Sequence, residues 1–144
     1  MMTDDQRRAI EADCARLILQ YFWANDAHDW AQVAGLFAPE GRYARPSQPG
    51  NFVTGRGAIL DSFTSRPARA QRHVVANILV EVESATRATA KSVLVLYMGD
   101  APALGELPRQ DAKSPMIGFY HDIIVLTDEG WRFAERNGGL DFAP

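Results

Sequence analysis

Apolar residues near the start of the chain recur with the spacing of an α-helix. They stand at positions i, i+4, i+7, i+8, i+11 and i+12, namely Ile10, Cys14, Leu17, Ile18, Tyr21 and Phe22. This spacing predicts a helix over residues 4 to about 27 with one apolar stripe. Asp26 lies four residues after Phe22 and continues the stripe. A carboxylate in such a position needs a polar partner.

Two shorter helices are expected next. Asp29 is typical of an N-cap, with Gln32 at the third helical position. The apolar face of this second helix would consist of Trp30, Val33 and Phe37, and residues 39–41 would end it. After a short strand at 42–45 and a Pro/Gly loop, a third helix is predicted to end before Pro67. Its apolar residues are Ile59, Leu60 and Phe63.

From Arg69 onward the period of apolar residues changes to two. Strands are predicted at 70–83, 87–98, 115–127 and 130–137, with a tight hairpin turn at 128–130. Helices followed by antiparallel strands indicate an α+β fold, and we expect one domain over residues 1–144. Residues 99–114 have no period and are rich in Pro, Gly and charge. A loop of this length is typical of a functional or a disordered segment.

The strand patterns predict two apolar sheet faces. In the first long strand, His73 and Asn77 share one parity, whereas the other parity holds Val74, Ile78, Val80 and Val82. The helices can cover only one face. We therefore predict that a second copy of the chain covers the other, as a homodimer or a higher homo-oligomer.

Composition and charge narrow the class of protein. Hydrophobic residues make up 47% and charged residues 23% of the chain, and the net charge is −3 without any Lys/Arg run. Neither a nucleic-acid partner nor a membrane partner is expected. The polar N-terminus and the absence of an apolar run of about 20 residues predict a cytoplasmic protein. Cys14, the only cysteine, cannot form an internal disulfide and is expected in the core.

Three residues far apart in the sequence carry the candidate chemistry. If the fold brings them together, Asp26 can orient the imidazole of His73, and Arg136 can stabilise developing negative charge. The alternative for Arg136 is an ion pair with Asp122. The sequence contains no metal-ligand spacing, no Gly-rich phosphate loop and no nucleophile elbow, so we expect neither a metal nor a cofactor.

Several segments resemble the SnoaL-like branch of the nuclear-transport-factor-2-like superfamily. They are residues 21–30, 36–41, 72–73 with Asn77, 118–122, 130–132 and 136–138. The resemblance covers almost the whole chain. It implies a cone-shaped barrel, in which a strongly curved, mostly antiparallel mixed sheet wraps around the N-terminal helices.

Within this branch the chain most resembles the group of scytalone dehydratase, hexachlorocyclohexane dehydrochlorinase and bile-acid dehydratase. That resemblance implies a catalytic Asp–His dyad of Asp26 and His73, with Arg136 as a pocket arginine. It also implies that Tyr43 polarises a substrate carbonyl. The chain departs from scytalone dehydratase at Asn25, where that family member has tyrosine. It also has Tyr97 or Met98 where a second pocket histidine is expected.

Further residues are predicted to contact the substrate. They are Asn77, which shares the parity of His73, His121, whose strand parity looks buried, and the apolar residues Phe119 and Trp23. Ligand pockets are mostly apolar with few polar groups, so core aromatic residues can also line the cavity.

The resemblance and the three polar residues together predict a cofactor-independent lyase. It would remove a proton from a small apolar, cyclic molecule and expel water or halide. One alternative is an isomerase or cyclase that uses the same base without a leaving group. The other is a non-catalytic binding or assembly module, such as the small subunit of a ring-hydroxylating dioxygenase, which shares the fold.

Overall fold

The computed structural model describes residues 1–142 and consists of three helices and six strands. In chain order these are α1 (Asp4–Asp26), α2 (Trp30–Gly35), β1 (Phe37–Ala44), β2 (Val53–Thr54), α3 (Arg56–Thr64), β3 (Arg69–Ser84), β4 (Arg87–Asp100), β5 (Met116–Thr127) and β6 (Gly130–Leu140). Helices followed by long antiparallel strands confirm the α+β class. No helix within the described residues has the length and apolar composition needed to cross a membrane.

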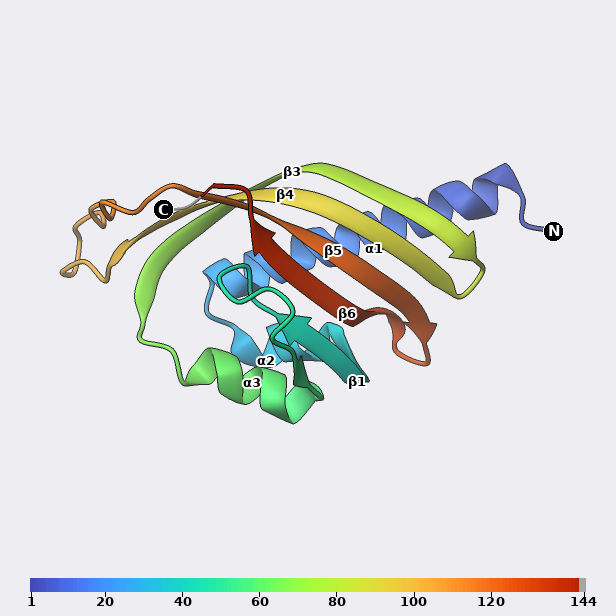
Figure 1. Cartoon of the computed structure of the whole chain (residues 1–144), viewed down its shortest axis with the longest axis horizontal. Helices are drawn as coiled ribbons and strands as arrows, with labels where there is room; N and C mark the ends of the chain where they lie inside the picture. The colour runs from blue at the N-terminus through green and yellow to red at the C-terminus, as the bar shows by residue number, and fades with distance from the viewer. Residues whose placement is uncertain (143–144) are drawn as a thin grey trace.

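One curved sheet holds all six strands, in the order β2-β1-β6-β5-β4-β3. Strands β1 and β6 run parallel, and every other neighbouring pair is antiparallel. Figure 1 shows the long strands arching over α1, with α2 and α3 lying near β1. The predicted curved sheet around N-terminal helices is confirmed. In the described residues it stays open, with β2 and β3 as its edges, and does not close into a barrel.

Helix α1 forms as the sequence predicts. Thr3 caps its N-terminus in a capping box with Gln6, and Asp4 and Asp5 lie in the first turn, where acidic side chains are favourable. The predicted stripe is buried: Cys14, Leu17, Ile18, Tyr21 and Phe22 all belong to the core. The helix ends at Asp26 and packs on β3.

The second helix is shorter than predicted. Helix α2 ends at Gly35, and Phe37 is the first residue of β1, where it pairs with Phe133 of β6 and is fully buried. Residues 39–41, expected to end the helix, lie inside β1 at a shift in register with β6. A Cβ at Gly41 would lie 2.7 Å from the Phe133 carbonyl oxygen. Pairing with a strand some 90 residues away thus decides the local conformation, and no local pattern reveals it.

The four predicted strands form an antiparallel meander, and the hairpin turn at 128–130 is confirmed. A β-bulge interrupts the first pair. Ala76 pairs with Val93 but Leu79 pairs with Lys91, so one extra residue of β3 is accommodated between them. Asn77 lies in this bulge with φ of 53°, a left-handed conformation that Asn adopts more readily than most residues.

The bulge reverses the alternation of side chains along β3. On either side of the bulge, the partly buried positions are His73 and Val75 before it, then Ile78, Val80 and Val82 after it. The predicted shared face of His73 and Asn77 is therefore wrong. His73 faces the helices, whereas Asn77 is exposed on the outer face, because a single inserted residue exchanges the two faces of a strand.

The segment 101–115 between β4 and β5 turns back onto the end of β4. The backbone N–H of Asp111 donates to the carbonyl of Met98 at 2.7 Å, and Arg69 of β3 binds the Asp111 carboxylate at 2.6 Å. Pro108, Arg109 and Gln110 of this segment line a surface pocket together with Asp26, so the segment lies near the C-terminal end of α1.

Candidate functional site

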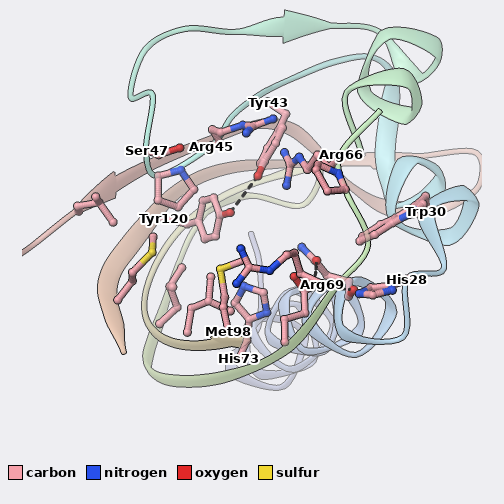
Figure 2. A pocket seen from close by; sticks show the side chains of 18 residues that line it. His28, Trp30, Tyr43, Arg45, Ser47, Arg66, Arg69, His73, Met98 and Tyr120 are labelled. Atoms are coloured by element: carbon pink, nitrogen blue, oxygen red, sulfur yellow. Dashed lines mark hydrogen bonds between the residues drawn. The ribbon is translucent and has the colours of Figure 1, made fainter. Parts of the chain in front are cut away.

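A pocket of ≈ 320 Å³ lies between the concave face of the sheet, the start of α2 and the segments that follow β1 and α3. Its apolar wall consists of Leu94, Leu96, Met98, Met116 and Leu140. Figure 2 shows His73 and Met98 on one side and Tyr43 and Arg45 on the other. An apolar cavity with a few polar groups is the usual form of a small-molecule site.

The carboxylate of Asp26 lies against the ring of His73 at this pocket. Asp26 Oδ1 is 2.6 Å from His73 Nδ1, and Oδ2 accepts a hydrogen bond of 2.8 Å from the His73 backbone N–H. The two side chains are only 6% and 7% exposed. With the carboxylate ionised, Nδ1 is the donor in this contact, and in the neutral imidazole Nε2 is then the acceptor. The arrangement equips His73 to take a proton.

The end of α1 is fixed to β3 beside this pair. Gln71 donates two hydrogen bonds to Asn25, at 2.8 Å to its carbonyl and at 2.6 Å to its side-chain oxygen. The Phe22 ring lies 5.1 Å from the His73 ring. Arg72 Nη1 lies 3.9 Å from Asp26, but this side chain is largely exposed and contributes little to the charge balance.

Three tyrosine hydroxyls meet across the pocket from His73. Tyr120 Oη lies 3.2 Å from Tyr43 Oη and 3.4 Å from Tyr21 Oη. Tyr43 and Tyr120 line the pocket, whereas Tyr21 lies behind them in the core. Burial raises the pKa of Tyr120 well above its usual value, and the nearby charge of Arg136 opposes this only in part. The Tyr120 hydroxyl is therefore neutral at pH 7 and can donate a hydrogen bond.

Arg136 does not reach the pocket. Its side chain is fully buried, with its guanidinium carbon 4.0 Å from the centre of the Tyr120 ring and 4.2 Å from that of Tyr21. Its Nε lies 3.5 Å from Oδ1 of Asp122, which is also buried. This is the alternative pairing that the sequence suggested. The two tyrosine rings cover the guanidinium, so a substrate in the pocket would not touch it.

Four predicted substrate contacts lie away from this pocket. Phe119, His121 and Asn77 lie on the outer face of the sheet, and Trp23 is 69% exposed on α1. The expectation that the parity of His121 is buried is wrong. Its neighbours Tyr120 and Asp122 face the core, and alternate residues of a strand point to opposite faces.

Some pocket residues were not singled out by sequence reasoning. Gln71 and Arg45 each lie two positions from a predicted site residue, and the period of a strand would have indicated them. His28 also lines the pocket, as does Trp30, which was expected only on the apolar face of the second helix. Arg66 follows α3 and has no such signal in the sequence.

No cluster of three or more His, Cys, Asp or Glu side chains within residues 1–142 is suited to hold a metal ion. Cys14 is fully buried in α1, and burial raises the pKa of its thiol to about 12. It is therefore protonated at neutral pH and packs as a core residue.

The curved open sheet, the helices inside it and the apolar pocket at one end define an α+β domain of the NTF2-like class. The chain belongs to the SnoaL-like domain family, whose model matches residues 6–137. The comparison with curated proteins found no match.

Three solved structures illustrate the similarity of fold. A candidate scytalone dehydratase from Novosphingobium aromaticivorans DSM 12444 has a TM-score of 0.78 at 20% identity, over 99% of this chain and 91% of that one. A type 2 hexachlorocyclohexane dehydrochlorinase has a TM-score of 0.77 at 15% identity, over 99% and 92%. An NTF2-like protein with a cystatin-like fold from Novosphingobium aromaticivorans has a TM-score of 0.71 at 20% sequence identity, over 95% of this chain and 86% of that one. Such identities show a shared fold alone.

Proposed function

We propose that this protein is a cofactor-independent lyase that uses His73, assisted by Asp26, to remove a proton from carbon. The observation that carries the proposal is the contact of 2.6 Å between Asp26 and His73 at the wall of an apolar pocket. A carboxylate at Nδ1 fixes the tautomer that leaves Nε2 as a base, and it stabilises the imidazolium that forms.

In the proposed reaction, Nε2 of His73 accepts a proton from a substrate carbon. The electron pair of that C–H bond forms a carbon–carbon double bond as the leaving group departs from the neighbouring carbon. When the leaving group is hydroxide, the imidazolium returns the proton and water is released. When it is halide, the proton passes to solvent. Either way His73 is regenerated without a cofactor.

The tyrosine hydroxyls provide the second half of the mechanism. Tyr43 and Tyr120 line the pocket and are within hydrogen-bond distance of each other. Either hydroxyl can donate to a substrate carbonyl and stabilise negative charge on its oxygen. Arg136 is a positioning residue in this scheme, because it stacks on the Tyr120 ring and acts on the substrate only through it.

The pocket and the comparisons support a small, largely apolar substrate. The volume of ≈ 320 Å³ is near the lower end for ligand sites. Two proteins of similar fold are named as a candidate scytalone dehydratase and a hexachlorocyclohexane dehydrochlorinase, and both names describe eliminations. Their names are a reason to test elimination first for this chain.

Proton exchange in D2O tests the base without knowledge of the leaving group. The purified protein is incubated with cyclic ketones, cyclic β-hydroxy ketones and chlorinated cycloalkanes, and products are followed by mass spectrometry. Elimination lowers the substrate mass by water or HCl, whereas isomerisation or exchange without elimination keeps every heavy atom and only adds mass through deuterium taken up from D2O. We expect His73→Gln to lower the rate by about 10²-fold or more. Equal rates for His73→Gln and wild type would contradict the proposal.

His121→Gln is the matched control. It makes the same change at an exposed histidine on the outer face of the sheet, outside the pocket. We expect it to retain the wild-type rate. If no substrate class shows turnover or exchange above the buffer rate, the non-catalytic alternative becomes the better account.

A further inference from the structure

Two arginines line the pocket without an acidic partner. Arg45 follows β1, Arg66 follows α3, and no carboxylate within residues 1–142 forms an ion pair with either. Arg69, the third arginine of the pocket, differs, because its Nη2 lies 2.6 Å from Oδ2 of Asp111. The eighteen lining residues include no Asp or Glu. The Asp26 carboxylate neighbours the pocket only through His73, on the opposite side, so the arginine side of the pocket is positively charged in a chain whose net charge is −3.

The guanidinium of Arg66 is held in place by α3. Its Nε donates to the carbonyl of Ser62 at 3.1 Å, and its central carbon lies 4.3 Å from the centre of the Phe63 ring. Its Nη2 is buried and has no hydrogen-bond partner in the described residues. Buried donors are rarely left unpaired in folded proteins, so the Arg66 guanidinium has hydrogen-bonding capacity that the described residues do not use.

Arg45 lies near Arg66 and, like it, carries a positive charge without an acidic partner in the described part of the chain. Burial lowers the pKa of Arg45, and the positive charge of Arg66 lowers it further. Figure 2 shows both side chains with Tyr43 on the side of the pocket opposite His73. Two like charges in a partly buried site repel each other, and an anion placed between them would remove that cost.

We propose that Arg45 and Arg66 form a subsite for an oxyanion of the substrate, either a carboxylate or a phosphate ester. Guanidinium groups bind both through paired N–H donors. The substrate would then have an apolar ring against the strands, its anionic group at the arginines and its reacting C–H bond at His73. This inference deepens the proposed function and rests on it, since it takes the pocket as the substrate site.

Calorimetric titration with three matched probes tests the subsite. The probes are cyclohexanecarboxylate, the neutral cyclohexanecarboxamide and cyclohexyl phosphate, each added to the full chain. We expect the carboxylate or the phosphate to bind about tenfold or more tightly than the amide. The anion that binds more tightly shows whether the anionic group of the substrate is a carboxylate or a phosphate ester. Equal affinity of the anions and the amide, or no anion binding at all, would overturn the proposal.

Substitutions at the two arginines test whether these side chains cause the preference for anionic over neutral probes. Arg45→Gln and Arg66→Gln should each reduce anion affinity about tenfold while leaving amide affinity unchanged, and Arg66→Lys should retain part of the preference. Arg42→Gln is the control, because Arg42 binds Glu135 outside the pocket. An anion preference that survives in the Arg45→Gln/Arg66→Gln double variant contradicts the subsite. Circular dichroism of each variant verifies folding.

The two proposals fail in distinguishable ways. His73→Gln should bind the anionic probes as wild type does, because the subsite does not include the base. Anion binding without proton exchange on any substrate contradicts the proposed reaction and leaves the subsite intact. Turnover of neutral substrates with no gain from an anionic group contradicts the subsite alone.

Discussion

Asp26 accepts hydrogen bonds from both the ring and the backbone of His73, at 2.6 Å to Nδ1 and 2.8 Å to the amide nitrogen. One carboxylate thus fixes both the tautomer and the position of the imidazole. The contact joins the last residue of α1 to the start of β3, so the geometry of the base depends on how the helix packs on the sheet.

Asp26→Asn should abolish the basicity of Nε2 while largely preserving the fold. The amide NH2 can donate to Nδ1, which moves the ring proton to Nε2 and removes the acceptor. We expect a loss of about 10²-fold or more in proton exchange, together with a change of tautomer in the 15N chemical shifts of the His73 ring. Asp61→Asn, an exposed position on α3, is the matched control. An unchanged tautomer in Asp26→Asn would contradict the assigned role.

Arg136→Met should destabilise the protein strongly. It leaves the Asp122 carboxyl buried without its charged neighbour, and removing one member of a buried pair costs about 3–5 kcal/mol. The double variant Arg136→Met/Asp122→Leu should recover much of the loss, because no buried charge remains. Urea unfolding measures both. Arg87→Met, which breaks an exposed pair with Glu83, should change stability by less than about 0.5 kcal/mol.

Stability should depend on pH through Asp122. Burial raises the pKa of this carboxyl from 3.8 to about 6, and Arg136 opposes the rise only in part. The folded state therefore binds a proton more tightly than the unfolded state. The contribution to stability is complete below about pH 4 and is lost as the pH rises through 6, which corresponds to about 3 kcal/mol in total.

Unfolding free energies measured from pH 4 to 7 test this dependence. Asp122→Asn cannot titrate, so the difference in stability between wild type and this variant should change with pH over that range. Asp128→Asn, in the turn between β5 and β6, is the control and should show no such change. A difference between wild type and Asp122→Asn that is constant with pH would refute the assignment.

The bulge at Asn77 should tolerate glycine but not a β-branched residue. Its φ of 53° suits Gly and Asn, whereas the left-handed conformation costs other residues about 1–2 kcal/mol. We expect Asn77→Gly to leave the free energy of unfolding nearly unchanged and Asn77→Val to lower it by about 1–2 kcal/mol. Ala76→Val, one position earlier and also exposed, should be tolerated. Equal effects of valine at the two positions would contradict the role of the bulge.

The outer face of the sheet should mediate self-association. Of the four apolar residues that the strand pattern placed on one face of β3, only Val74 lies on the outer face, because the bulge moves Ile78, Val80 and Val82 to the core side. Val74, Leu79 and Tyr97 are 52%, 46% and 41% exposed on this face. We expect a homodimer at micromolar concentration in sedimentation equilibrium and a monomer for Val74→Glu. Leu104→Glu, in the loop after β4, removes an exposed leucine elsewhere and should leave the dimer intact. A monomeric wild type would contradict this prediction.

Elements with local signals could be predicted from the pattern of amino acids alone. The spacing of apolar residues gave α1 and its buried stripe, and the period of two gave the four long strands and their hairpin. The identity of Asp26 and His73 as a candidate pair came from a polar residue on an apolar stripe together with the family resemblance.

Features that depend on the register between distant segments could not be predicted in this way, because packing in three dimensions sets that register. Pairing of β1 with β6 converted the expected end of α2 into a strand, and the bulge at Asn77 exchanged the faces of β3. The packing of distant segments also places the Arg136 guanidinium against the Tyr120 ring and brings Arg66 to the pocket. A one-residue shift moves a side chain to the opposite face of a sheet, and packing against distant segments, not local pattern, sets such shifts.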